Sequence, residues 1–498
     1  MVFVGQTGIR RKSSVRFSRM WRAISDRVRP VITGWKTCQH WVLCYGVSAF
    51  ELRKATHSRR FAVMKIFRVL CLLTPILVAS HLSAGQTPTL PPENLQLLSL
   101  GQAISEALDK NLDLIATRYD VSIAQARILT ARLRPNPIFS LEAGHLNYPI
   151  TPDFNNSHAG GPNEFAIRTD FVLERGGKRE RRIEVAEASR GVAELQVLNA
   201  VRTVFLNVET AFVDILQAKA NLALALDSLG SFDEIVNVNT VRVRNGDLAE
   251  VELIRSQVAQ LQFENTVRQA QLQTQTARAR LQILLGRTIT DPLVDASGEM
   301  RRDAVPVDLP TLRQSAFTQR PDLLALRRDQ IRSQAELRLQ LALGKVDYTI
   351  GSEYRRQQGA SGYGNLMGFF FSANLPVFNR NQGEIARAGQ EQLQVEAKLR
   401  ALEAMVQNDV QISYLQYGNA LATLNRVEGS LLQRATDVRQ ITEFSYRRGE
   451  ANFLEFLDAQ RAYNETMQAY NEARGEFARS RYGIDAATGE STAEGIRP

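Results

Sequence analysis

Two long stretches of the chain alternate apolar and polar residues with the spacing of a coiled coil. The first covers residues 178–243, which contain no proline. Its apolar residues recur at steps of three and four, which predicts an α-helix about 100 Å long with one apolar face. A glycine turn at Gly246 and a returning helix over 250–285 would complete a helical hairpin. The apolar face consists of Leu195, Leu198, Val201, Phe205, Val208, Phe212 and Ile215.

The same order of patterns returns in the second half of the chain. A shift of 203 residues aligns the turn at Gly246 with a turn at Gly449, and a shift of 209 residues aligns the helical pattern from residue 100 with that from residue 309. A second long helix is predicted over 383–446, with a returning helix over 453–482. Such internal repetition indicates a duplicated chain.

Four shorter segments alternate apolar and polar residues with a period of two, which is typical of β-strands. The two in the first half are separated by a loop rich in proline, asparagine and glycine, and the two in the second half by a polar loop at 357–364. The predicted strands cover residues 138–146, 165–173, 346–354 and 366–377. Each is about as long as a tilted strand that crosses a bilayer, which needs about 9–11 residues.

The predicted fold is therefore mainly α with a small β part. Four strands cannot close a barrel, since the smallest barrels have about eight, so a homo-oligomer is needed. In a trimer, twelve strands would form a transmembrane β-barrel, and the long antiparallel, coiled-coil-like helices would continue it as a tube. A soluble coiled coil or bundle without a pore is the alternative that periodicity leaves open.

The first 84 residues differ from the rest of the chain. Residues 1–63 hold 13 of the 61 basic residues and only 2 of the 52 acidic ones. Residues 64–84 have a basic start, an apolar run and small residues before Gly85, which predicts a signal peptide. Residues 1–63 are then a basic extension that is disordered or not translated. A short membrane anchor and a genuine basic arm are the rival interpretations.

The remaining boundaries follow the repeats. Residues 85–99 are predicted to be a linker and 100–286 the first repeat, with the order helix, strand, strand, long helix, helix. A second linker at 287–308 leads to the second repeat at 309–489. Residues 490–498 form a tail.

Composition excludes several kinds of function. All three cysteines precede residue 85, so the body has no disulfide, thiolate nucleophile or cysteine metal site. The body carries 46 basic and 50 acidic residues, which gives no support for nucleic-acid binding. It contains no phosphate-binding glycine loop, metalloprotease helix or hydrolase elbow. We expect no enzyme activity, no cofactor and no catalytic residue.

Several short motifs occur in the duplicated order. They are Leu98-Ser99-Leu100-Gly101-Gln102-Ala103-Ile104, Arg134-Pro135-Asn136-Pro137, Arg320-Pro321-Asp322-Leu323, Asn374-Leu375-Pro376-Val377-Phe378, Asn381-Gln382-Gly383 and Tyr446-Arg447-Arg448-Gly449-Glu450. With these motifs, residues 95–490 resemble the TolC-type outer-membrane efflux proteins. The segment 173–179, with Arg182, is similar to the branch of cobalt-zinc-cadmium resistance channels.

The resemblance implies a homotrimeric channel in the bacterial outer membrane, with a helical extension into the periplasm. Such a channel is the exit duct of a tripartite pump. Its partners would be a periplasmic adaptor protein, an inner-membrane transporter of the resistance-nodulation-division class and outer-membrane lipid. The expected cargo is divalent heavy-metal cations. A multidrug or type I secretion channel, and a periplasmic scaffold without a pore, are the alternatives.

The two glycine turns would form the periplasmic tips of the channel. Glycine permits the left-handed backbone that a tight helix–helix turn requires. The resemblance implies that the adaptor docks at these tips, whereas the plain alternative is an ordinary loop. The expected docking residues are Arg244, Gly246, Asp247, Arg447, Gly449 and Glu450.

Four charged residues follow the turns and are expected to form the periplasmic gate. Glu455 and Asp458 are three positions apart, so they share a helix face. The resemblance implies that they line the narrow entrance, where threefold symmetry would make two cation-attracting carboxylate rings. In the first repeat Glu252 corresponds to Glu455, but Arg255 corresponds to Asp458. An ion pair of Arg255 with Glu252 or Asp458 could hold the closed state. A solvated helix face is the alternative.

His145 and His158 flank the first predicted loop. Two histidines alone are a weak indication of a metal site, and surface loop residues are the preferred interpretation. No metal site is therefore predicted.

Overall fold

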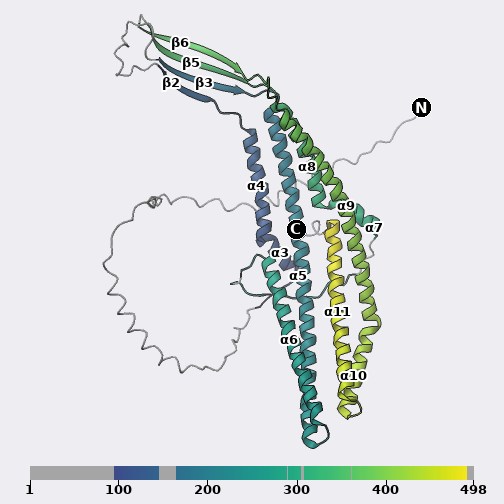
Figure 1. Cartoon of the computed structure of the whole chain (residues 1–498). Helices are drawn as coiled ribbons and strands as arrows, with labels where there is room; N and C mark the ends of the chain where they lie inside the picture. The colour runs from purple at the N-terminus through teal and green to yellow at the C-terminus, as the bar shows by residue number, and fades with distance from the viewer. Residues whose placement is uncertain (1–94, 145–163, 289, 304–307, 360–361, 491–498) are drawn as a thin grey trace, which may run out of the picture. The chain divides into compact units, whose positions relative to one another are not determined.

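The computed structural model describes residues 95–144, 164–288, 290–303, 308–359 and 362–490, all within the unit Leu90–Pro498 (Figure 1). The predicted basic extension and signal peptide lie outside the described residues, as do His145 and His158. The described part is mainly helical with one four-stranded sheet, as the patterns predict, and one small two-stranded sheet, which they did not predict.

The first half of the described chain contains two short helices, two strands and a long helical hairpin. A short strand precedes them and another follows them, and these two strands pair with each other. In order, the elements are β1 (Gln96–Leu98), α3 (Leu100–Lys110), α4 (Leu112–Arg132), β2 (Ile138–Gly144), β3 (Glu164–Leu173), α5 (Lys178–Asn245), α6 (Glu250–Leu284) and β4 (Val294–Ala296).

The second half repeats this order, with its long helix interrupted by one π-helical turn. The elements are α7 (Leu309–Gln319), α8 (Pro321–Leu343), β5 (Tyr348–Gly359), β6 (Gly362–Ala373), α9 (Gln382–Arg426), the π turn η1 (Val427–Leu431), α10 (Leu432–Arg448) and α11 (Phe453–Thr488).

A side-chain cap explains why the helical pattern that begins at residue 100 forms two helices, α3 and α4. The side-chain oxygen of Asn111 accepts a hydrogen bond from the backbone N–H of Leu114 at 2.9 Å, which starts α4. The amide of Asn111 also donates to the carbonyl of Leu284, at 2.9 Å. Asn111 therefore also fixes the start of α4 to the end of α6.

The polar segment 357–364 is largely strand, so the prediction of a loop there was wrong. β5 and β6 pair in antiparallel register up to Gly359 and Gly362. Arg356 stacks over the ring of Tyr363 with 4.8 Å between the guanidinium carbon and the ring centroid. A cross-strand pair of this kind stabilises a strand without an apolar pattern.

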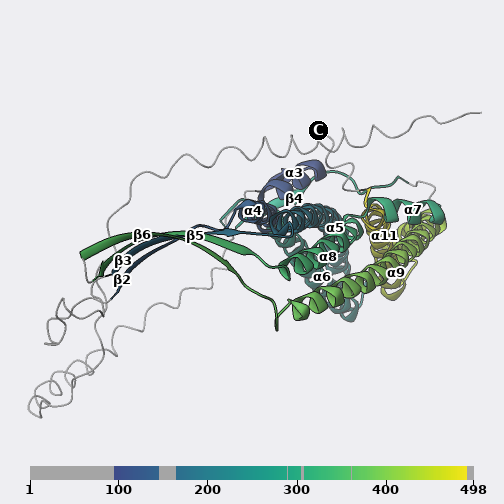
Figure 2. The ribbon, with the colours of Figure 1, turned by 90° about the horizontal axis from the view of Figure 1, so that it is seen from above.

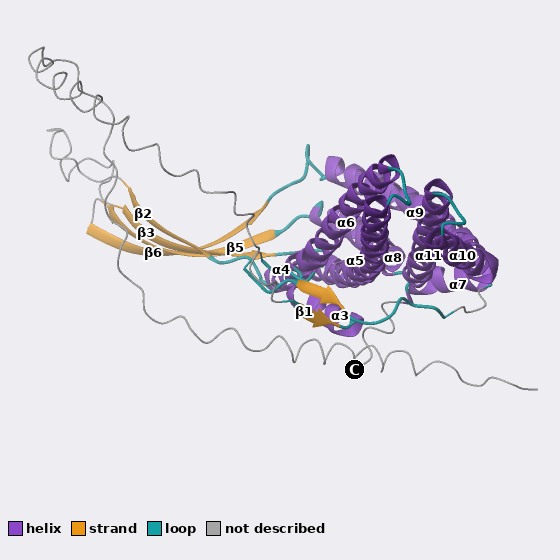
Figure 3. Ribbon diagram, turned by 90° about the horizontal axis from the view of Figure 1, so that it is seen from below, coloured by secondary structure: helices purple, strands orange, loops and turns teal. Residues whose placement is uncertain are grey.

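The linkers that flank the first repeat also contain strands. β1 belongs to the first linker and β4 to the second, and they pair in parallel (Figure 3). Asp295 of β4 is buried, with ion pairs to Lys219 at 2.8 Å and Arg278 at 3.2 Å. The second linker is thus fixed to the first helical hairpin.

The four long strands form one antiparallel sheet in the order β2-β3-β5-β6, which curves beside the helices in Figure 2. Its register places apolar side chains on one face, and they are exposed. Examples are Phe139, Leu141, Ile167, Phe171, Ile350, Tyr354, Met367, Phe369 and Phe371.

The opposite face of the sheet carries charges. The guanidinium of Arg355 pairs with Glu353 and Glu164, each at 2.8 Å, and lies 3.8 Å from Glu142. Arg168 pairs with Asp170 at 2.9 Å on the same face. The sheet therefore has one apolar and one charged side.

The helical body is organised around α5, which packs against α4, α6, α8 and α11. One core joins α3, α5 and α6 with the two linker strands, and a second joins α7, α9 and α11. None of the described helices combines the length and apolar character that crossing a membrane requires.

Candidate functional site at the helical tips

Both hairpin turns have the same backbone geometry. Gly246 and Gly449 have φ angles of 83° and 82°, in the left-handed region that favours glycine. The N–H of Gly246 donates to the carbonyl of Val243 and that of Asp247 to Arg242, at 3.1 and 2.8 Å. This is a Schellman motif, and the equivalent pair of bonds closes α10. The predicted conformation of the two glycines is confirmed.

The two helices that leave the turns begin differently. At the start of α11, the side chain of Asn452 accepts from the N–H of Glu455 at 2.9 Å, and the Glu455 carboxylate accepts from the N–H of Asn452 at 3.3 Å. This capping box holds Glu455 in place. At the start of α6 the corresponding residue is Ala249, which has no side-chain cap.

In the first repeat, where this cap is absent, the carboxylate of Glu252 pairs with Arg255. Arg255 donates to Glu252 at 2.9 Å, one of the two ion pairs considered from the sequence. Asp458 is exposed and makes no ion pair with Arg255 within the described part of this chain. The structure thus brings Glu252 and Arg255 together and leaves Asp458 facing solvent.

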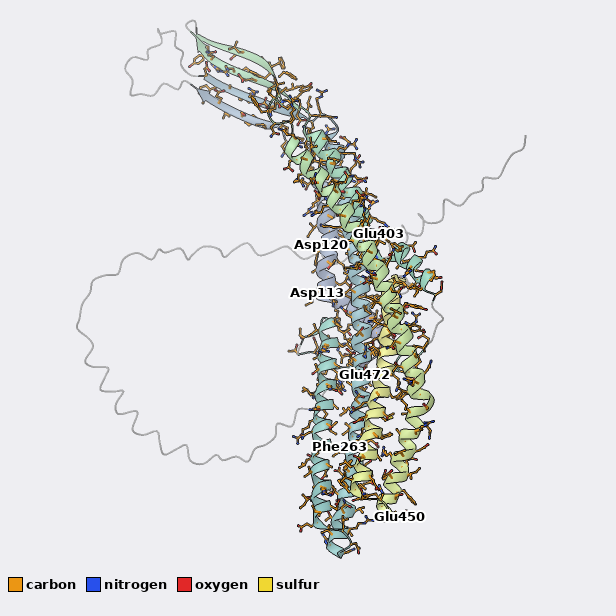
Figure 4. The ribbon with its side chains drawn as sticks, turned by 45° about the vertical axis from the view of Figure 1, so that its right-hand side comes forward. Asp113, Asp120, Phe263, Glu403, Glu450 and Glu472 are labelled. Atoms are coloured by element: carbon orange, nitrogen blue, oxygen red, sulfur yellow. The ribbon has the colours of Figure 1, made fainter. Side chains whose placement is uncertain are left out.

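The docking residues expected at the tips are accessible. Arg244, Gly246 and Asp247 of the first tip are exposed, and so are Gly449 and Glu450 of the second. Figure 4 labels Glu450 at the end of its hairpin. Arg447 is also exposed, but its guanidinium is held by Glu234 and Glu443, each at 2.7 Å. The Arg447 side chain therefore links the end of α10 to Glu234 of α5.

An aromatic core lies behind the tips. The rings of Phe232 and Phe263 stack with 4.3 Å between centroids, and those of Tyr446 and Phe456 with 5.4 Å. Phe453 completes the cluster. These rings come from α5, α6, α10 and α11, so one apolar cluster joins both hairpins near their ends.

Polar contacts join the two hairpins as well, and the sequence patterns did not predict them. Arg242 of α5 donates to the backbone carbonyls of Tyr446 and Arg447, at 3.3 and 2.5 Å. The hydroxyl of Tyr446 donates to Oδ1 of Asn239 at 2.8 Å. Burial raises the pKa of Tyr446 above its usual value, although the hydrogen bond to Asn239 opposes the shift. The phenol therefore stays neutral and can donate.

The segment with Arg175, Gly176 and Lys178 fixes the junction between strands and helices. The ammonium of Lys178 is buried and donates to Asp347 and to the carbonyl of Lys345, each at 2.7 Å. The N–H of Arg175 donates to Asp347 at 2.9 Å. A Cβ on Gly176 would lie 2.5 Å from the Lys345 side chain, so glycine permits this approach. The segment joins β3–α5 to α8–β5.

No group of three or more histidine, cysteine, aspartate or glutamate side chains in the described ranges could hold a metal ion. The charged side chains at the tips pair with neighbouring charges, as Arg255 does with Glu252, or face solvent, as Asp458 does.

The chain matches the family described as outer membrane efflux protein over residues 103–287 and 312–490, one segment in each half. It is 24% identical over 411 residues to the cobalt-zinc-cadmium resistance protein CzcC of Cupriavidus metallidurans, which covers 82% of this chain and 94% of CzcC.

Solved outer-membrane channels have the same fold. The channel OprN has a TM-score of 0.64 at 19% identity, covering 78% of this chain and 89% of OprN. CmeC of Campylobacter jejuni has a TM-score of 0.64 at 16% identity, covering 80% and 88% of the two chains. CusC has a TM-score of 0.61 at 18% identity, covering 78% and 92%.

Proposed function

This chain belongs to the outer membrane efflux protein family, and we propose that three copies of it form the exit channel of a tripartite pump for divalent metal cations. The predicted resemblance and outer-membrane location are confirmed by the family. The family and the similar structures are channels, so the protein is a channel and not an enzyme. Our proposal adds the trimer, the pump, the gate and the cargo.

The observation that carries the proposal is the sheet with its exposed apolar face. In the single chain, β2 and β6 are its two edges, and the side chains of its apolar face are exposed. Such a sheet is stable only when further strands cover its edges and an apolar medium covers that face. Copies of the same chain supply the strands, and outer-membrane lipid supplies the medium.

Exposed apolar stripes on the helices support a ring of copies. Val251, Ile254 and Val258 of α6 are each about half exposed, at steps of three and four. Ile441 and Phe444 of α10 form a second exposed stripe. The α6 stripe of one copy can cover the α10 stripe of the next, which is a head-to-tail contact of the kind that closes rings.

Charge supports a cationic cargo. On the charged face of the sheet, three carboxylates surround the single guanidinium of Arg355. At the tips, Glu455 and Asp458 would form two acidic rings in a trimer, with Arg255 tied to Glu252 beside them. The similar protein CzcC is named for resistance to cobalt, zinc and cadmium, and these are the ions that we propose as cargo.

The exposed tips are the proposed contact with the rest of the pump. Gly246 and Gly449 present open turns, and each is followed by an acidic residue, Asp247 and Glu450. We propose that a periplasmic adaptor protein docks there and connects the channel to an inner-membrane transporter of the resistance-nodulation-division class.

The cargo is tested by deleting the gene and measuring growth on zinc, cobalt, cadmium, copper and common drugs. The proposal expects lower tolerance of divalent metals alone, restored by the wild-type gene. Sensitivity to drugs with normal metal tolerance would contradict the metal cargo and favour the multidrug alternative. Recovery of the protein as a soluble periplasmic monomer would contradict the channel and favour a scaffold.

A further inference from the structure

The long helix of the second repeat contains one wider turn. Over Val427–Leu431 the helix is π-helical, and the N–H of Leu432 donates to the carbonyl of Val427, five residues back. The helices on both sides, α9 and α10, are ordinary α-helices. π turns inside α-helices hold one extra residue and frequently lie at functional positions.

The burial pattern shows where the extra residue lies. In α9 the inward positions Tyr417, Ala420 and Leu424 lead to Val427 at steps of three, four and three. Ser430 is half-buried, and the next apolar residue that faces inward is Leu432, five residues after Val427. Buried or half-buried residues then recur at steps of three and four through α10, and Thr436, Glu443 and Ser445 beside them are half-buried as well. The recurring positions are Leu432, Ala435, Arg439, Thr442 and Tyr446. The π turn absorbs the surplus residue and keeps one face of the helix towards its partner.

The turn also lies at the edge of a weakly packed zone. The core of α7, α9 and α11 extends along α9 as far as Leu424, whereas the aromatic core at the tips includes Tyr446. Tyr446 is the single buried residue of α10. On α11, no residue of 461–470 is buried. The tip section is thus joined to the body by helices with few buried contacts, which is where local motion needs the least free energy.

A polar network holds the π turn to the second linker. Arg302 donates to Glu428 at 2.8 Å and to the hydroxyl of Tyr470 at 2.9 Å. Tyr470 in turn donates to Glu428 at 3.1 Å. These residues come from the linker, the π turn and α11. The neighbouring Arg301 pairs with Asp485 at 2.6 Å, so this end of the linker is itself fixed to α11.

We propose that the π turn Val427–Leu431 is the pivot of the second hairpin, and that Arg302 and Tyr470 latch it through Glu428. Motion of the tip section then bends the chain at this turn while the core around α9 stays packed. This inference rests on the proposed channel function, because it assigns the place where the gate moves.

The backbone hydrogen bonds of the helix explain why a π turn can act as a pivot. A regular α-helix resists bending because each N–H bonds the carbonyl four residues back, whereas a π turn is a recognised position of helix kinks. Gly429 lies inside the turn, and a Cβ there would meet no atom within 4 Å. Alanine therefore fits at this position without displacing a neighbour.

Deletion of Gly429 tests the pivot, measured as the frequency of transitions between conductance levels of the purified trimer in planar bilayers. The deletion removes the surplus residue, so the inward faces of α9 and α10 stay in phase in one continuous α-helix. We expect about a tenfold lower transition frequency, which corresponds to about 1.4 kcal/mol. Gly429→Ala is the matched control, because it keeps the residue count and the π turn, and its frequency is expected to stay near that of the wild type.

The latch is tested separately with Arg302→Ala, which keeps the π turn. The pair is partly exposed, with 54% of the Arg302 and 37% of the Glu428 side chain accessible, so we expect about a threefold higher transition frequency. Arg313→Ala is its control, since Arg313 bonds Gln411 away from the turn, at 2.8 Å. It should leave the frequency unchanged.

The outcomes separate the pivot from the channel itself. Three results would each contradict the pivot without contradicting the channel function. They are a wild-type transition frequency in the deletion variant, an equal decrease in the deletion variant and in Gly429→Ala, and an unchanged frequency in Arg302→Ala. Absence of conductance from the wild-type trimer would overturn the proposed function instead. If the deletion variant does not form trimers, the Arg302→Ala measurement decides alone.

Discussion

The hydroxyl of Tyr446 donates a 2.8 Å hydrogen bond to Oδ1 of Asn239, and both residues are buried between α10 and α5. These residues are 207 positions apart in sequence, and their contact joins the two hairpins behind their tips. The Asn239 amide nitrogen has no hydrogen-bond partner among the residues that the structure describes, so Tyr446 supplies the hydrogen bond of that side chain. The pair is therefore a specific point at which the hairpins are held together.

Tyr446→Phe should loosen the hairpins at the tips. It leaves a second polar atom of Asn239 unsatisfied, at a cost of about 1–3 kcal/mol. Hydrogen exchange of the backbone amides in α10 near residue 446 should accelerate about tenfold or more, while α9 stays protected. Tyr463→Phe is the control, because the ring of Tyr463 lies under Arg439 at 4.7 Å and phenylalanine keeps that contact. Equal protection in Tyr446→Phe and the wild type would refute the link.

Charge removal at the proposed gate should raise the single-channel conductance. Asp458 is exposed, and Arg255 holds Glu252, so Asp458→Asn and Arg255→Gln each change the charge at the entrance. We expect the conductance in planar bilayers to rise for both variants, with a weaker preference for cations in Asp458→Asn. Glu472→Gln on the same helix, far from the tip in Figure 4, serves as the control. Unchanged conductance in both gate variants would remove these residues from the gate.

The two faces of the sheet should respond oppositely to a new charge. Leu141 and Ser140 are neighbours on β2, with Leu141 on the exposed apolar face and Ser140 beside Arg168 on the charged face. Leu141→Arg should destabilise the assembled channel by about 2–4 kcal/mol, because we propose that the apolar face contacts lipid. Ser140→Arg should assemble normally. The amount of trimer recovered from outer membranes measures both, and equal recovery would mean that the apolar face does not meet lipid.

Stability should fall at alkaline pH through Tyr482. Burial raises the pKa of Tyr482 to about 12, and the carboxylate of Glu209 adds to the shift. In the unfolded chain a tyrosine titrates near about 10, so the neutral phenol contributes its full stability below that pH. The contribution is lost as the pH rises from 10 towards 12. Thermal unfolding of Tyr482→Phe should therefore be less sensitive to pH in this range, and identical slopes in both proteins would contradict the assignment.

The sequence predicted those parts of the fold and of the candidate site that depend on neighbouring residues. The periodicity around Val208 predicted α5, and the two turn glycines predicted left-handed backbone at Gly246 and Gly449. The pairing of Arg255 with Glu252 was also accessible, because residues three apart on a helix are neighbours. Each of these features follows from residues that are close together in the sequence.

The features that were missed depend on distant segments. The strand at Gln96–Leu98 exists because β4, almost two hundred residues later, pairs with it, and no pattern in three residues predicts that. The contact of Arg242 with the carbonyl of Arg447 is similarly long-range. The strand pairing around Tyr363 was missed because polar residues on both strands resemble a loop. In all three cases the structure is determined by contacts between segments that the local sequence does not reveal.

The π turn was also missed, because the sequence around it keeps the apolar spacing of a regular helix. Leu431 follows Val427 at a step of four, so the pattern continues without a break. In the structure Leu431 is about half exposed, and Leu432 faces inward instead. The surplus residue is therefore visible only in the three-dimensional packing.

The central claim is that three copies of this chain form a cation-conducting channel through the outer membrane. The most direct test is the reversal potential of the purified, detergent-extracted oligomer in a planar bilayer with a zinc chloride gradient. The account predicts a particle of three chains, discrete conductance steps and a reversal potential that shows zinc ions crossing more readily than chloride. A monomer without conductance, or a reversal potential set by chloride, would contradict it.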